Sequence, residues 1–233
     1  MRGVILAGGT GSRLIPVNPT GINKHCLTVY DRPMIYWALD VLHDNGINDI
    51  TVVSSPKGVG ELAIMLKGGI SYRVQDRPGG IAQALYCAKS KSRESIFVIL
   101  GDNIFLPSPG TVELNLDELA SCYLTKIPKS RLREFWVPQF NESDKIVCIQ
   151  EKPLEPSSEY AVTGLYAFEP DVFSRIEGMP VGVRGEMEIS DLLSTYAIEN
   201  KLGHCIFDGF WGDAGTPQGL SDCSLACEKW VNK

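Results

Sequence analysis

The chain has 233 residues, with 44% hydrophobic and 21% charged side chains, a formal net charge of −6 and a sequence pI near 5.2. This composition is typical of a globular protein with one substantial core. The acidic balance, without a cluster of lysine or arginine, argues against nucleic acid or an anionic membrane as the main partner. No apolar run is long enough to span a membrane, and no signal-peptide pattern is present, so we expect a single cytoplasmic domain over residues 1–233.

The first distinctive segment is the apolar run at residues 4–7, which breaks into glycines and ends on Arg13. A buried strand that opens into such a loop presents backbone N–H groups and one cation to a ligand, and proteins hold phosphate in this way. It is not a P-loop, because Arg13-Leu14 stands where Lys-Ser/Thr is required. It is not a dinucleotide fingerprint either, because Leu14 replaces the third glycine. The glycines alone leave two interpretations open, a tight connection and a ligand-binding loop.

Strand-like and helix-like segments then alternate. Apolar runs of strand length recur at residues 50–54, 72–74 and 96–100. Apolar residues at helical spacing predict one helix over 35–42, ending before Gly46, and another over 81–89. This alternation predicts an α/β fold with a mostly parallel sheet and helices on both faces, in which ligands bind beyond the carboxyl ends of the strands.

An acidic residue stands at one of these strand ends. The run at 96–100 is continuously apolar, which indicates a fully buried strand, and it stops at Gly101-Asp102-Asn103. A carboxylate that emerges from such a strand is suited to a divalent cation or a reacting proton. The alternative is that Asp102 only caps the following turn.

The second half of the chain is richer in strand patterns, at residues 146–150 and 161–168, before a helical stretch at 188–200. Three short charged motifs accompany these elements: Glu151-Lys152-Pro153, Arg184-Gly185-Glu186, and Gly212-Asp213-Ala214-Gly215-Thr216. Taken singly, each is more typical of a solvent-facing loop than of a catalytic site.

Seven cysteines are scattered along the chain without a C-x-x-C pair, which predicts reduced thiols in a cytosolic protein. Cys223 and Cys227 are one helical turn apart, but no histidine cluster completes a zinc site.

The motifs nevertheless occur in an order that one enzyme family shares. The chain resembles the sugar-phosphate nucleotidylyltransferases, and among them the short-form glucose-1-phosphate thymidylyltransferases (dTDP-glucose pyrophosphorylases). The resemblance runs from Gly3 to about Leu220, through Lys24, Gln75 and the segments LAGGTGSRL, YDRPMIYW, GGIAQAL, LGDNIF, EKPLEP, YAVTGLY, RGEMEISD and GDAGT. It implies the nucleotide-diphospho-sugar transferase fold, a Rossmann-like, mostly parallel mixed sheet with helices on both faces and a small β-rich sugar-binding region. Residues 1–110 would form mainly the nucleotide-binding part, and residues 130–220 mainly the sugar-binding part with the second metal ligand.

The implied reaction is Mg²⁺-dependent transfer of a thymidylyl group from dTTP to a sugar 1-phosphate, with α-D-glucose 1-phosphate as the expected acceptor. Because both reactants are strongly anionic, cations carry most of the catalysis. The residues that match the family's motifs fall into four groups. They are catalytic Arg13, Lys24 and Lys152; nucleotide-binding Gly8, Gly9, Gly11, Gln75, Gly80 and Asn103; sugar-phosphate-binding Glu151, Lys152, Val162, Arg184 and Trp211; and metal-binding Asp102 and Asp213.

Three departures keep alternatives open. The loop between Arg13 and Lys24 is one residue longer than usual, Thr28 replaces a common proline, and Trp136 replaces a glycine that approaches the sugar in relatives. The alternatives are the same chemistry with UTP or with another hexose 1-phosphate, and a catalytically weak nucleotide-sugar-binding regulatory protein. Because the chain ends soon after GDAGT, we expect no long-form allosteric region, and a monomer or a homodimer.

Overall fold

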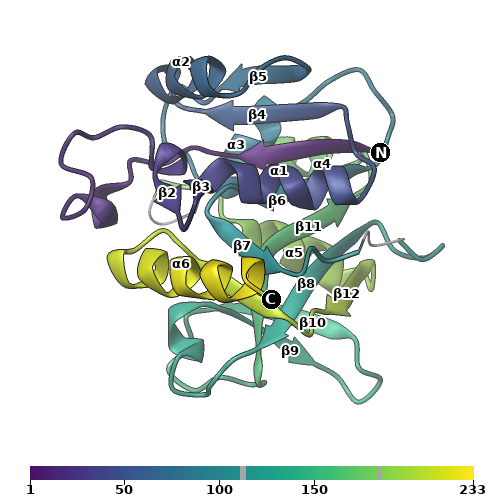
Figure 1. The fold of residues 1–233 in the computed structure, drawn as a ribbon. Coiled ribbons are helices and arrows are strands. Elements are labelled where there is room, and N and C mark those ends of the chain that lie inside the picture. Colours follow the sequence, from purple (N-terminus) through teal and green to yellow (C-terminus); the bar gives the residue numbers. More distant parts are fainter. Residues whose placement is uncertain (111–113, 183–184) are drawn as a thin grey trace.

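The computed structural model describes residues 1–110, 114–182 and 185–233, and within them a seven-stranded sheet in the order β12-β8-β11-β6-β1-β4-β5 (Figure 1). β11 runs antiparallel to its neighbours β6 and β8, and the other pairs are parallel. The fold prediction of a mostly parallel mixed sheet is therefore confirmed. The strands are β1 (Arg2–Leu6), β4 (Ile50–Ser54), β5 (Ile70–Val74), β6 (Ile96–Leu100), β8 (Ala120–Lys126), β11 (Tyr160–Phe168) and β12 (Leu202–Ile206).

Helices cover both faces of this sheet, because the side chains of each strand alternate between the two faces. Val4 and Val98 pack with α3, α4 and α5 on one face, whereas Ile5 and Ile99 pack with α1 and α2 on the other. All four side chains are fully buried. The five helices are α1 (Met34–Asp44), α2 (Pro56–Met65), α3 (Ile81–Cys87), α4 (Val172–Gly178) and α5 (Ile189–Ile198).

Small two-stranded sheets stand beside the main sheet and carry much of the site. β7 (Asn103–Leu106) follows directly on β6 and pairs antiparallel with β13 (Phe210–Asp213). β9 (Trp136–Phe140) and β10 (Ile146–Glu151) form an antiparallel pair, and β2 (Thr28–Val29) pairs with β3 (Arg32–Pro33). Three 3₁₀ helices complete the described elements: η1 (Ser12–Leu14), η2 (Lys24–Cys26) and η3 (Leu132–Glu134).

The last helix, α6 (Pro217–Val231), is yellow in Figure 1 and packs against β13 and β7. Its Cys223 and Cys227 are buried in a hydrophobic cluster with Ile104 and Ala214. All seven cysteines of the chain are free thiols, and burial raises the pKa of both α6 cysteines. These two cysteines therefore serve packing. Within the described ranges, no helix has the length and apolar character needed to cross a lipid bilayer.

Candidate active site

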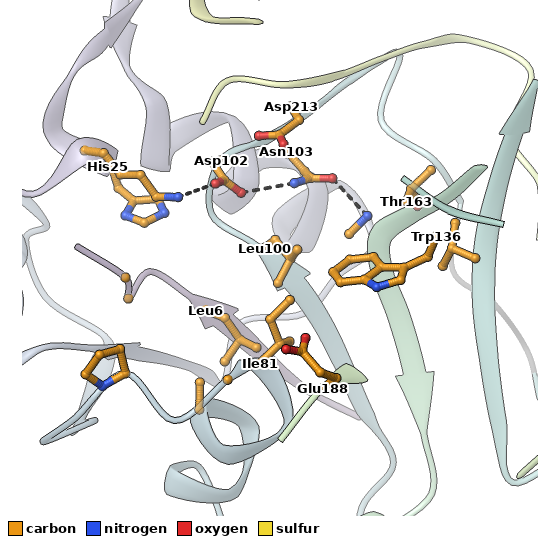
Figure 2. Close-up of a pocket in the computed structure, with 18 of the residues that line it drawn as sticks. Leu6, His25, Ile81, Leu100, Asp102, Asn103, Trp136, Thr163, Glu188 and Asp213 are labelled. Atoms are coloured by element: carbon orange, nitrogen blue, oxygen red, sulfur yellow. Dashed lines mark hydrogen bonds and ion pairs between the residues drawn. The ribbon is translucent and has the colours of Figure 1, made fainter. Parts of the chain in front are cut away.

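A cavity of about 380 Å³ opens at the carboxyl ends of β1 and β6, where the parallel-sheet rule places ligands (Figure 2). Its walls come from loops, 3₁₀ helices, the small sheets, helix α3 and the main-sheet strands β1, β6 and β11. It is lined by Leu6, Gly8, Gly9, Arg13, Lys24, His25, Gln75, Pro78, Gly80, Ile81, Ala84, Leu100, Asp102, Asn103, Phe135, Trp136, Val162, Thr163, Gly164, Glu186, Glu188, Trp211 and Asp213.

The glycine loop after β1 forms one wall of this cavity. Gly9 has a φ of +88°, a left-handed conformation that glycine adopts without strain. At Gly8 a Cβ atom would lie 2.7 Å from Gln75 Oε1, so a larger residue at this position would collide with the Gln75 side chain. Gly11 also has a left-handed φ, of +63°, and begins η1, but it is absent from the described lining of the cavity. Its role is to turn the chain so that Arg13 reaches the cavity.

Gln75 stands at the end of β5 and is held by the segment that follows it. Its Nε2 donates to the Gly80 carbonyl oxygen at 3.2 Å and to Gln83 Oε1 at 2.6 Å. Gly80 has a φ of +96°, and a Cβ there would lie 2.4 Å from the Met187 carbonyl oxygen. A side chain at residue 80 would therefore push this wall of the cavity apart.

Asp102 and Asp213 come from distant parts of the chain and meet through strand pairing. β13 places Asp213 opposite Asn103, the residue after Asp102. Gly215 marks the meeting point: a Cβ there would lie 2.8 Å from Asp213 Oδ1 and 3.1 Å from both Asp102 Oδ2 and Arg13 Nη2. The two carboxylates and the Arg13 guanidinium therefore converge on one small space.

Lys24 and Asn103 hold the two oxygens of Asp102. Lys24 Nζ forms an ion pair with Asp102 Oδ2, and Asn103 Nδ2 donates to Asp102 Oδ1 at 3.1 Å. Burial opposes ionisation of this carboxyl, but the Lys24 ammonium, the neighbouring His25 and the hydrogen bonds from Lys24 and Asn103 together lower the pKa of Asp102 below its usual range. Burial and the nearby Asp102 charge raise the pKa of Asp213. The pair thus favours a cation close to both carboxylates.

Asn103 connects this carboxylate to the opposite wall of the cavity. Its Oδ1 accepts hydrogen bonds from Trp211 Nε1 at 2.7 Å and from the Gly164 backbone N–H at 2.9 Å, and its side chain is buried. Figure 2 shows its hydrogen bond to Asp102. Trp211 meets Phe135 edge to face, with ring centroids 5.0 Å apart. Asn103 was predicted to bind nucleotide, and the structure shows its amide engaged with protein groups on both sides.

His25 lines the cavity beside Lys24 and was missed by the motif reading. Burial, assisted by the Lys24 charge, lowers the pKa of His25 to about 3, so the ring is neutral near pH 7. Its Nδ1 lies 2.7 Å from Asn23 Oδ1, and Asn23 Nδ2 donates to the Ala7 carbonyl oxygen at 3.1 Å. Asn23 is the N-cap of η2, a signal that the sequence contains. Because Asn23 caps the helix that begins at Lys24 and also binds the Ala7 carbonyl oxygen, it holds Lys24 close to the glycine loop.

Only some of the residues predicted to bind the sugar phosphate line the cavity. Val162 and Trp211 line the cavity, whereas Glu151 and Lys152 lie at the end of β10 and are absent from the described lining. Lys152 has a φ of +44°, rare for a residue with a side chain, and its backbone N–H donates to the Phe135 carbonyl oxygen at 3.0 Å. Arg184 lies outside the described residues.

Trp136, the first residue of β9, lines the cavity opposite His25 (Figure 2). Its indole nitrogen is buried without a hydrogen-bond partner among residues 1–110, 114–182 and 185–233. Phe135, Thr163, Glu186 and Glu188 also line the cavity, and the sequence motifs did not single them out as site residues.

A doubly covered α/β sheet with a glycine loop, two cations and paired carboxylates at its carboxyl edge defines a nucleotide-diphospho-sugar transferase fold. The chain belongs to the nucleotidyl transferase family, whose model matches residues 2–229. Membership confirms the resemblance found in the motifs and makes the chain a nucleotidyltransferase.

Named relatives and solved structures agree with this assignment. A glucose-1-phosphate thymidylyltransferase of Neisseria meningitidis is 37% identical, over 96% of this chain and 81% of the relative. One of Mycobacterium tuberculosis is 35% identical, with the same shares. A Bacillus anthracis structure described as a glucose-1-phosphate thymidylyltransferase in complex with sucrose is 38% identical, with a TM-score of 0.85 over 97% of this chain and 94% of that one. A UDP-glucose pyrophosphorylase bound to UDP-glucose shares the fold, with a TM-score of 0.85 at 20% identity over 98% of each chain.

Proposed function

We propose that the protein transfers a thymidylyl group from dTTP to a sugar 1-phosphate, with glucose 1-phosphate as the expected acceptor. A phosphate oxygen of the sugar 1-phosphate forms a bond to the α-phosphorus of dTTP, the bond to the β-phosphate breaks, and pyrophosphate leaves. The observation that carries the proposal is the convergence of Arg13, Asp102 and Asp213 around Gly215, with Lys24 on Asp102. The names of the relatives supply the nucleotide and the sugar.

In this proposal the glycine loop and the cations hold the triphosphate. Backbone N–H groups of Gly8 and Gly9 face the phosphates, with Gly11 turning the loop. Arg13 contacts phosphate oxygens with its planar fork, and Lys24 acts as a point charge on the α-phosphoryl group. These cations offset the charge that builds up in the transition state, which is the main catalytic demand of phosphoryl transfer.

The residues present fit a divalent cation, and we propose Mg²⁺. The carboxylates of buried Asp102 and half-buried Asp213 face one space. Burial and the Asp102 charge raise the pKa of Asp213, so a cation between the two carboxylates would stabilise its ionised form. Asp102 and Asp213 would be the protein ligands, because their carboxylate oxygens converge at Gly215. When bound, Mg²⁺ would offset phosphate charge and keep positions for phosphate oxygens and water.

The two ends of the cavity would bind the base and the sugar. Gln75 and Gly80 would contact the thymine, in a nucleotide-binding part at residues 1–110. Val162, Trp211, Glu151, Lys152 and Arg184 would hold the sugar phosphate, in a part at residues 130–220. The free cysteines fit a reducing compartment, for which we propose the cytoplasm, and we propose a monomer or a homodimer.

A second candidate function keeps the reaction and changes the acceptor. Trp136 brings an indole into the acceptor end of the cavity, and a ring of that size limits which hexose 1-phosphate fits. UTP is a second possible donor, because it differs from dTTP by a methyl group and a 2′-hydroxyl.

The test is Mg²⁺-dependent pyrophosphate release with dTTP over a panel of sugar 1-phosphates, with UTP as the competing nucleotide. We expect the fastest release with dTTP and glucose 1-phosphate. Release with another sugar alone would support the second candidate, and dTTP binding without release from any sugar would identify a nucleotide-binding regulatory protein.

A further inference from the structure

The Lys24 ammonium occupies the oxygen of Asp102 that faces the convergence point at Gly215. The other oxygen, Oδ1, is taken by the amide of Asn103. Both side chains of the Lys24–Asp102 pair are largely buried, so solvent screens the contact only weakly. A cation that binds Asp102 must therefore compete with Lys24.

The charges around this point are already balanced. Asp102 and Asp213 bring two carboxylates, and Lys24 and Arg13 bring two cations. A divalent cation that enters alone would add charge to a buried and balanced group, which is costly. A nucleotide triphosphate that enters with the cation would supply phosphate oxygens as new partners for Lys24.

We propose that Lys24 is a placeholder for the divalent cation on Asp102, and that the nucleotide releases it, so that nucleotide and cation bind cooperatively. This inference rests on the proposed function, because it takes dTTP as the nucleotide and Asp102 as a metal ligand. It adds a positioning role to Lys24: in the free protein Lys24 orients the Asp102 carboxylate and blocks the oxygen that a metal would bind. Binding coupled in this way is reciprocal, so it can be measured from either side.

The first experiment measures Mn²⁺ binding to the nucleotide-free protein by the loss of the free-ion EPR signal. Lys24→Met removes the competing charge, and we expect it to bind Mn²⁺ about tenfold or more tightly than the unchanged protein, as expected for a close buried charge pair. Lys126→Met is the matched control, because Lys126 pairs with Glu159 where both side chains are exposed. Lys24→Arg keeps the charge and should retain weak binding.

The second experiment measures dTTP binding calorimetrically in EDTA. Asp102→Asn removes the anion that holds Lys24, and we expect it to bind metal-free dTTP more tightly than the unchanged protein, although it loses a metal ligand. Asp213→Asn is the control, because it removes the neighbouring negative charge but leaves the Lys24–Asp102 pair in place. The gain in Asp102→Asn should exceed the gain in Asp213→Asn, since only Asp102→Asn also releases Lys24. This arm still decides the question if Lys24→Met fails to fold.

Equal or weaker Mn²⁺ binding in folded Lys24→Met would overturn the inference. So would measurable dTTP binding in which folded Asp102→Asn gains no more metal-free affinity than folded Asp213→Asn. Neither readout requires turnover, so absence of pyrophosphate release would reject the proposed function without deciding this one. If the unchanged protein and Asp102→Asn both fail to bind dTTP, the proposed nucleotide is wrong, and the Mn²⁺ arm alone decides the role of Lys24.

Discussion

At the scale of single residues, Asp102 offers the most direct test of the proposed chemistry. Asp102→Asn keeps the shape of the side chain and removes the charge that would hold a cation, so we expect kcat to fall at least about a hundredfold. Pyrophosphate release under saturating substrates and Mg²⁺ measures it. Asp144→Asn, at an exposed turn, is the control and should keep full activity. Full activity in Asp102→Asn would contradict the assignment.

Trp136 is the residue that tests the acceptor. Trp136→Gly opens the end of the cavity that the indole now lines, so we expect the KM for glucose 1-phosphate to change by about tenfold, while the KM for dTTP stays the same. Steady-state kinetics with each substrate varied in turn separate the two constants. Trp136→Phe keeps a ring and should show a smaller change, and an unchanged sugar KM in both variants would make Trp136 a packing residue only.

The location of site residues in one cavity could be predicted from the sequence where a motif carries its own chemistry. The positions of Gly8, Gly9, Arg13, Lys24, Asp102 and Asp213 followed from glycine loops, strand ends and family motifs, and the structure brings these residues into one cavity. The engagement of Asn103 and the neutral state of His25 could not be predicted, because both depend on groups far away in the sequence. Asn103 is held by Trp211 and Gly164, and His25 is buried by the fold.

At the scale of elements, α6 is joined to the site by a short segment and a defined N-cap. Thr216 Oγ1 accepts a hydrogen bond from the Gly219 backbone N–H at 3.0 Å. Thr216→Ala should therefore lower the free energy of unfolding by about 1 kcal/mol, as measured by urea denaturation. Ser130→Ala, at an exposed loop, should change it by less than about 0.5 kcal/mol. Equal effects of the two substitutions would mean that the cap contributes nothing.

Elements were predictable where one pattern dominates. The expected strands at 50–54 and 96–100 match β4 and β6, because a short, continuous apolar run is typical of a buried strand. The helix expected over 81–89 ends two residues earlier. α2 was not predicted, because Gly58 and Gly60 lower helix propensity and Ile64 faces solvent, which blurs the apolar stripe. α6 was not predicted either, since its buried face is made of cysteines.

At the scale of the whole molecule, stability depends on a sheet that is buried on both faces. Ile99 lies on central strand β6 and is fully buried. Ile99→Ala should lower the free energy of unfolding by about 2–5 kcal/mol. Ile64→Ala removes the same atoms from a side chain that is 85% exposed and should cost less than about 0.5 kcal/mol. Urea unfolding of both variants measures the contrast, and equal costs would contradict the assigned burial.

The direction of β11 lay beyond the hydrophobic pattern at this scale. Eight of its nine residues are buried, a pattern that is the same for either direction of the strand, and the antiparallel pairing with β6 and β8 depends on the path of the whole chain. The family resemblance implied a mixed sheet, whereas periodicity alone indicated only a mostly parallel one.

The pairing of β13 with β7 also sets the order in which the site is assembled during synthesis. The glycine loop, Lys24 and Asp102 belong to the first half of the chain, whereas Asp213 arrives on one of its last strands. A ribosome-bound chain that has not yet released residue 213 already has its phosphate loop and one carboxylate, but not the second. Because a domain folds as a unit, the carboxylate pair can form only after the segment that carries Asp213 has left the ribosome.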